Sequence, residues 1–160
     1  MILFCTTEEN REPKHAFTTW GKHWRQKKNV WPVDIWFKFN KDHAVAKIGF
    51  RSDNKKDHGS WYLKLSPKKF DIIGSSEGCQ EWTTLLSVED AGFTLLREFR
   101  FWDIPCENQR RFSCVGLRIY SSKGHSGWVS LKDVKMWEAE KVESLNTRNG
   151  QNVSGNCDLT

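Results

Sequence analysis

The chain has 160 residues, a formal net charge of +5 and nine tryptophans, and 13% of its residues are aromatic. This length suits one domain with a real core and is too short for two ordinary ones, while the aromatic content argues against disorder. Lys and Arg recur along the whole chain among Asp and Glu, so nucleic acid is not an expected partner. No apolar run approaches the roughly 18 residues of a membrane span.

The two ends of the chain differ in composition from its middle. Residues 1–14 are polar and contain a proline, and they lack the basic start and apolar core of a signal peptide. Residues 143–160 have the composition of a flexible tail. We therefore expect an N-terminal extension over 1–14, one domain over 15–142 and a C-terminal tail over 143–160.

The middle of the chain contains many short stretches with strand patterns. VDIWFKF at 33–39 alternates apolar and polar residues, and AVAKIGF at 44–50 follows after four polar residues, which predicts a hairpin. Further strands are predicted at 69–75, 82–87, 97–104, 112–120, 128–131 and 134–140. Six to eight strands without intervening helices predict an all-β sandwich or barrel.

Alternation also assigns side chains to strand faces. One face of the first strand carries Val33, Ile35, Phe37 and Phe39. In the strand at 112–120 the predicted core face carries Val115, Leu117 and Ile119, and the outer face carries Cys114, Gly116 and Arg118.

Five cysteines constrain both metal binding and disulfide formation. They include no CxxC pair and no histidines at zinc-finger spacing, so a structural zinc site is not expected. An odd number leaves at least one thiol unpaired in any monomeric disulfide scheme. Cys106 could bridge to Cys114 across a hairpin or pair with Cys79, and the spacing does not choose between these pairings.

Five stretches between Trp20 and about Glu140 follow one another in an informative order. They are Thr19-Trp20, WPVDIWFKF, AVAKIGFRSDN, FDIIGSSEGCQEWTTLL and FSCVGLRIYSSKGHSGWVSLKDVKMWE. This order resembles the discoidin domain, also called the coagulation factor 5/8 type C domain, of the galactose-binding-like superfamily. The resemblance implies an antiparallel jelly-roll β-sandwich with ligand-binding loops at one end. It also implies packed positions for Trp20, Trp82 and Trp137.

The resemblance bears on metal binding and on the chain ends. Many members of the family bind a structural calcium ion through an Asp before the Thr-Trp pair, whereas residues 14–18 contain no carboxylate here. No cofactor is therefore expected, although a structural calcium ion is left open. Members often join their termini through one disulfide, a role that the resemblance would give to Cys5 and Cys157.

Counting strands assigns the loops to the two ends of an antiparallel sandwich. If WYLKL at 61–65 is a short side strand, the loops 21–32, 51–68, 87–96 and 121–127 lie at one end, which the resemblance implies is the ligand-binding end. If WYLKL spans the whole sandwich, the last two loops leave that end.

The first of these loops supplies two candidate ligand-binding residues. Trp24, which is followed by Arg25, is expected to be an exposed aromatic that stacks on a sugar ring or inserts into a membrane interface. The alternative is that Trp24 caps the sandwich. Trp31 is expected to belong to the framework.

The second and fourth loops supply the remaining candidates. A sugar needs fixed donors and acceptors beside an apolar ring face. Arg51, Asp53, Asn54 and His58 with Trp61 would provide both, and His125 would add to them. The alternative is a solvated turn for 51–60 and a solvated histidine in the Gly/Ser loop.

These observations favour a non-catalytic, lectin-like module that binds a glycan or a protein surface. The sequence has no GxSxG, HExxH or phosphate-binding glycine motif, so no enzyme activity is expected. Shallow sites of this kind become effective through repetition, which favours a homo-oligomer or a multidomain parent protein. An extracellular or cell-surface location is expected. Two alternatives stay open, namely an anionic phospholipid surface bound through Trp24, Arg25, Lys27 and Lys28, and an intracellular protein-interaction domain.

Overall fold

The computed structural model of the chain describes residues 2–5, 24–27, 31–52 and 61–139, with backbone alone for 2–5 and 24–27. The limits predicted for the domain, 15 and 142, fall outside these residues. The elements are β1 (Ile2–Cys5), β2 (Trp24–Lys27), β3 (Val33–Arg51), the 3₁₀ helix η3 (Leu63–Leu65), β4 (Pro67–Ser75), β5 (Thr83–Val88), β6 (Phe99–Asp103), the 3₁₀ helix η4 (Cys106–Asn108), β7 (Arg111–Ser122) and β8 (Trp128–Glu138).

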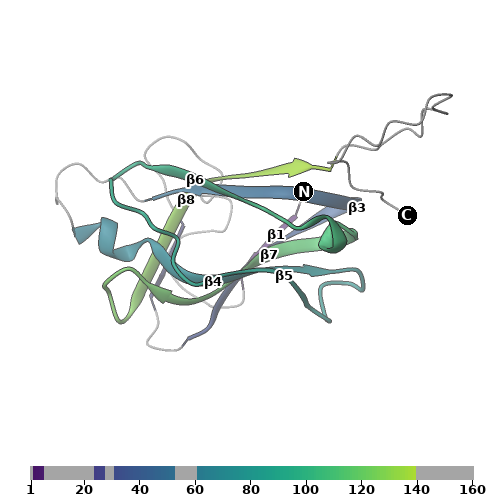
Figure 1. Ribbon diagram of the computed structural model, residues 1–160. Helices are drawn as coiled ribbons and strands as arrows, with labels where there is room; N and C mark the ends of the chain where they lie inside the picture. The colour runs from purple at the N-terminus through teal and green to yellow at the C-terminus, as the bar shows by residue number, and fades with distance from the viewer. Residues whose placement is uncertain (1, 6–23, 28–30, 53–60, 140–160) are drawn as a thin grey trace, which may run out of the picture.

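Two antiparallel layers form a sandwich, and strand β3 belongs to both of them (Figure 1). The first half of β3 pairs with β1 and β7, and that layer continues through β4 to β5. The second half of β3 pairs with β6 and β8, and β8 pairs in turn with β2. The predicted antiparallel β-sandwich is therefore confirmed. No helix in the described part of the chain is long and apolar enough to cross a bilayer.

The hairpin predicted at 40–43 is wrong, because 33–39 and 44–50 are parts of one continuous strand. Val33 to Lys38 pair with β7, whereas Val45 to Arg51 pair with β8. The corner follows Lys38: a register shift separates Lys38 from His43 and Ala44, which still pair with β7, and Val45 is the first residue that pairs with β8. Each half of β3 has an apolar face. Because the two halves lie in different layers, their apolar faces meet across the core.

Two other predicted elements also differ from the structure. The strands predicted at 128–131 and 134–140 are continuous as β8, in which Asp133 adopts a left-handed φ of 52° beside a register irregularity. The irregular backbone at this position interrupts the alternation of apolar and polar residues from which the strands were predicted. WYLKL is not a side strand, since Leu63–Leu65 form a 3₁₀ helix.

The core lies between the two layers, where alternation predicted it. Val33, Ile35 and Phe37 are at most 1% exposed, and the predicted core face of β7 is completely buried. Phe39 is only partly buried. The predicted faces of these two strands are thus confirmed except at the corner of β3.

Aromatic rings fill the core toward the end of β3. The ring of Trp102 lies with its centroid 4.8 Å from that of Phe50 and 5.0 Å from that of Phe70. Phe93, from the connection before β6, packs 5.6 Å from Phe50. Such pairs contribute about 0.5–1.5 kcal/mol each beyond their buried area, and they join β3, β4 and β6 to the Phe93 segment.

The disulfide differs from both pairings that the spacing allowed. Cys79 is bonded to Cys114, with their Cα atoms 5.5 Å apart. Cys106 is also disulfide-bonded, to neither of these residues. The end of β4 pairs with β7 beside Cys114, so the turn after β4 places Cys79 over the outer face of the sheet and buries Cys114 completely. The pairing of Cys5 with Cys157 falls outside the described side chains.

Gly116 allows β7 to pack closely against β3. An added Cβ would lie 2.5 Å from the carbonyl oxygen of Ile35 and 2.5 Å from Cβ of Trp36. Because these atoms cannot move independently, we expect Gly116→Ala to lower the free energy of unfolding by about 1–3 kcal/mol in urea denaturation. Gly124→Ala is the control, since its Cβ would lie 3.5 Å from Cγ of Lys64, an ordinary contact. Equal losses in the two variants would contradict this account.

Candidate functional site

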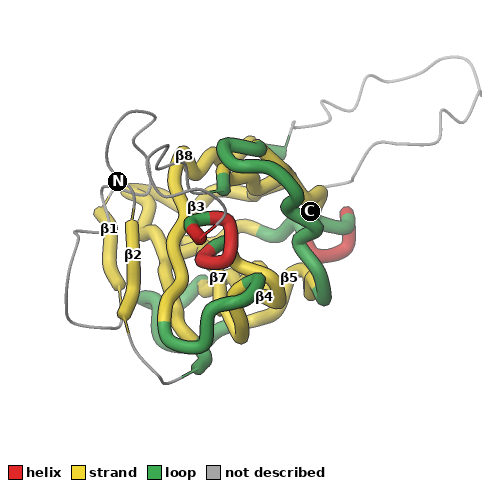
Figure 2. Tube along the Cα trace, turned by 90° about the vertical axis from the view of Figure 1, so that its left-hand side faces the viewer, coloured by secondary structure: helices red, strands yellow, loops and turns green. Residues whose placement is uncertain are grey.

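The 121–127 loop contacts the other three predicted loops at one end of the sandwich, which is on the left in Figure 1 and faces the viewer in Figure 2. The N–H of Gly124 donates to the carbonyl of Lys64 (3.1 Å), and the Lys123 ammonium donates to the carbonyl of Phe93. The indole N–H of Trp31 donates to the backbone oxygen of residue 126 (3.2 Å). The described parts of the four predicted loops therefore lie at one end, as expected if 61–65 does not span the sandwich.

Trp61 and His125, two of the predicted ligand-binding residues, are in contact at this end. Their ring centroids lie 5.7 Å apart at an interplanar angle of 87°. Trp61 also makes an edge contact with Tyr62, at 5.0 Å. Tyr62 is 5% exposed and Trp61 is 40% exposed, so a buried ring supports one that is open to solvent. The fully buried Leu65 of η3 fixes this segment to the core.

Hydrogen bonds set the orientation of the His125 ring. The backbone N–H of His125 donates to Oγ of Ser122 (3.0 Å), and the N–H of Gly127 donates to Nδ1 of His125 (3.1 Å). Because Nδ1 accepts this bond, the proton of the neutral ring resides on Nε2. The histidine therefore has a donor nitrogen beside the exposed indole of Trp61.

Arg51, a third predicted ligand-binding residue, is engaged within the protein. Its Nε donates to Oδ2 of Asp133 (3.1 Å), one terminal nitrogen lies 3.1 Å from the same oxygen, and the other donates to the carbonyl of Arg97 (2.7 Å). The carboxylate of Asp133 is only 3% exposed. All three guanidinium nitrogens thus join β3 to β8 and to the segment before β6.

The remaining predicted site residues are described less fully or not at all. Trp24 and Arg25 lie on β2, paired with Leu131 and Ser130, where the sequence reading expected an exposed loop. Their backbone is therefore a strand, and their side chains are outside the description. Three further candidates fall in the undescribed segment 53–60, namely Asp53, Asn54 and His58.

Glu98 organises the segment that leads into β6. Its carboxylate accepts hydrogen bonds from the N–H groups of Thr94 (2.7 Å) and Leu95 (3.1 Å) and from Nε of Arg100 (2.6 Å). Burial alone would raise the pKa of Glu98, but these hydrogen bonds and the charge of Arg100 lower it to about 2. The ionised carboxylate therefore holds a tight turn on which Leu95 is 67% exposed.

Two large aromatic side chains are exposed outside the predicted loops. Trp137, predicted to be packed, is 40% exposed, and Phe101 is 54% exposed. They flank Lys47 on the outer face of the β3–β6–β8 layer, with its ammonium 4.4 Å from the centroid of Phe101 and 5.9 Å from that of Trp137. Trp137 follows the partly buried Met136 in β8, and neighbouring residues of a strand point to opposite faces. This alternation could have predicted that Trp137 lies on the outer face.

Within residues 31–52 and 61–139, no group of three or more His, Cys, Asp or Glu side chains is arranged to hold a metal ion. Residues 14–18, where the family pattern would place part of a calcium site, lie outside the described residues.

Comparison with solved structures relates the fold to two kinds of domain, although no family model and no curated protein sequence matches the chain. Chitosan-binding module 1 of a Paenibacillus sp. IK-5 chitosanase/glucanase superposes with a TM-score of 0.66 at 13% identity, covering 85% of this chain and 93% of the module. The family 32 carbohydrate-binding module of Clostridium perfringens NanJ, solved with galactose, gives 0.61 at 14% identity, covering 84% and 91%. An F5/8 type C domain from Bacteroides fragilis gives 0.60 at 11% identity, covering 78% of each chain.

The chain therefore has the β-sandwich fold shared by family 32 carbohydrate-binding modules and F5/8 type C domains. This is the galactose-binding-like fold that the order of the sequence pieces predicted. At these identities the likeness concerns the fold, and it assigns no ligand to this chain.

The hydrogen bonds of Glu98 predict a pH-dependent contribution to stability. Its folded pKa of about 2 lies below the ordinary 4.5, so the contribution is fully present above pH 4.5 and is lost as the pH falls toward 2. We expect Glu98→Gln to lower the free energy of unfolding at neutral pH, and the difference from the unsubstituted protein to vanish near pH 2 in urea denaturation.

Glu89→Gln is the matched control for this experiment. Glu89 is paired with Lys69 at 2.9 Å, but its side chain is 77% exposed, and surface pairs of this kind contribute little. A difference between the Glu98 variant and the unsubstituted protein that stays constant from neutral pH to pH 2 would show that the carboxylate does not act through its charge.

Proposed function

We propose that the chain is a non-catalytic glycan-binding module whose site lies at the loop end of the sandwich, around Trp61 and His125. The observation that carries this proposal is the exposed ring of Trp61, held by the buried Tyr62 and set beside a donor nitrogen. Apolar C–H groups of a sugar pack on such a ring, and hydroxyl groups accept the hydrogen bond of an adjacent donor.

The site is rigid in its described part, which favours binding because little side-chain entropy is lost when a ligand arrives. Trp61 is restrained by two edge contacts, and His125 is restrained by hydrogen bonds to Ser122 and Gly127. The segment 53–60 directly precedes Trp61, so we propose that Asp53, Asn54 and His58 add polar contacts to the same ligand.

The structural neighbours support a glycan as the class of ligand. One of them is described as chitosan-binding, and another was solved in complex with galactose. We propose an extracellular location. We also propose that the module acts in repeated copies, either in an oligomer or in a multidomain protein, because a single shallow site binds weakly. The proposed extent of the domain remains 15–142.

Replacement of Trp61 tests both the ligand class and the location of the site. A glycan array of the native protein would first identify a bound glycan, and titration calorimetry would then compare variants. We expect Trp61→Ala to weaken binding by about tenfold or more, equivalent to about 1.4 kcal/mol. Trp137→Ala is the matched control, because Trp137 is also 40% exposed but lies on β8, and it should bind as the unsubstituted protein does.

The alternative outcomes are distinguishable. Equal weakening in both tryptophan variants would contradict the proposed site while leaving the ligand class intact. Absence of any glycan binding, together with salt-sensitive binding to vesicles of anionic phospholipid, would instead favour the membrane-surface alternative.

A further inference from the structure

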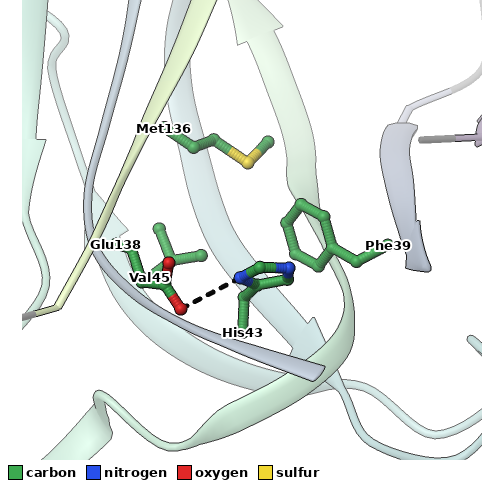
Figure 3. Close-up of a pocket in the computed structure, with 5 residues that line it drawn as sticks. All are labelled: Phe39, His43, Val45, Met136 and Glu138. Carbon is green, nitrogen blue, oxygen red and sulfur yellow. Dashed lines mark hydrogen bonds and ion pairs between the residues drawn. The ribbon is translucent and has the colours of Figure 1, made fainter. Parts of the chain in front are cut away.

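A cavity opens where β3 turns between the layers and β8 ends (Figure 3), at the end of the sandwich opposite the loops (Figure 1). It is open to solvent, has a volume of about 220 Å³ and is lined by Phe39, His43, Val45, Met136 and Glu138. Drug-sized ligands usually occupy about 300–1,000 Å³. The cavity is therefore suited to one ring-sized group.

The walls of this cavity are apolar. Val45 is 3% exposed, and Phe39 and Met136 are partly buried against the core. The rings of Phe39 and His43 meet edge to face, with centroids 5.0 Å apart, which fixes both at the mouth. A ligand placed here would contact a phenyl ring and a thioether, both of which pack well against C–H groups.

The rim of the cavity presents hydrogen-bond acceptors. Nδ1 of His43 lies 3.0 Å from Oε1 of Glu138 (Figure 3), and because a carboxylate only accepts, the histidine is the donor. In the neutral ring Nε2 is then an acceptor, and Oε2 of Glu138 is a second one. Glu138 is 57% exposed and His43 is 27% exposed, so both groups are accessible from solvent.

Two cations lie near this corner of β3, namely the exposed Lys41 and Arg111. Arg111 donates to the backbone carbonyl of Asp42 at 3.2 Å, so its hydrogen bond goes to the chain and not to Glu138. The rim therefore combines a carboxylate charge with acceptor atoms above an apolar floor.

We infer that this cavity binds a single amino-sugar residue in its ammonium form, as a second site separate from the loop end. An ammonium group has three donors and no acceptor, which suits Oε2 of Glu138. Nε2 of His43, on the side of the ring away from Glu138, accepts instead from a hydroxyl group of the same sugar. The C–H face of the pyranose ring packs on Phe39 and Met136. N-acetylation removes the positive charge, so the site discriminates against acetylated sugars.

Met136 offers a direct reporter for this site. The chain has two methionines, Met1 and Met136, so methyl-¹³C methionine labelling gives two signals, only one of which comes from the cavity. We expect D-glucosamine at neutral pH, with ionic strength matched by sodium chloride, to shift the Met136 methyl signal in a saturable way. N-acetyl-D-glucosamine and D-glucose at the same concentrations should leave it in place.

Two variants separate the charge of Glu138 from general effects. Glu138→Gln keeps an acceptor for His43 and should weaken glucosamine binding about tenfold or more. Glu107→Gln, on the exposed surface of η4 at the same end of the sandwich, removes an equal charge and should have no effect (Figure 1).

Three results would overturn the inference: no saturable shift, equal shifts with the acetylated sugar, or an unchanged affinity in Glu138→Gln. Trp61→Ala distinguishes this site from the loop-end site, because it should weaken glycan binding at the loops while the Met136 response to glucosamine persists.

Discussion

Strand β3 is the shared element on which both layers of the sandwich depend. Its first half pairs with β1 and β7 and its second half with β6 and β8, so one segment of backbone fixes the position of each layer relative to the other. The connection before it is tied to the 121–127 loop through Trp31, and the connection after it is tied to the 93–98 segment through Ser52. Its corner contributes Phe39 and His43 to the opposite end. Both candidate sites are thus positioned by the path of a single strand.

Much of the fold could be predicted from the sequence, because alternation reports burial directly. Val33, Ile35 and Phe37 on β3 are buried as their spacing predicted, and β7 behaves in the same way. The hairpin at 40–43 was wrong because a polar interruption looks the same whether the chain turns back within one sheet or moves into the other. Only the identity of the hydrogen-bonding partners distinguishes these cases, and those partners lie far away in sequence.

The candidate sites depend even more strongly on contacts between residues that are far apart in the sequence. Trp61 and His125 were each recognised as loop residues, but nothing local indicates that their rings meet, since they belong to different connections. His43 and Glu138 are 95 positions apart, and neither stands in a motif. For Arg51, the resemblance to a ligand-binding family suggested a ligand, whereas the buried carboxylate of Asp133 meets its guanidinium in the structure. The sequence indicated which residue types could bind a ligand, whereas the interaction partner of each residue could be identified only from the folded structure.

The bond between Cys79 and Cys114 makes the stability of this fold depend on the redox state of its surroundings. The two cysteines are separated by 35 positions, and closing a loop of that size removes about 4 kcal/mol of chain entropy from the unfolded state. Small domains are stable by only about 5–15 kcal/mol in total. Glutathione in a reducing compartment would withdraw a large share of that margin, whereas an oxidising one would preserve it. The cross-link lies on the outer face of the β7 layer, so its loss would first release the turn between β4 and β5 and leave the two ends of the sandwich assembled.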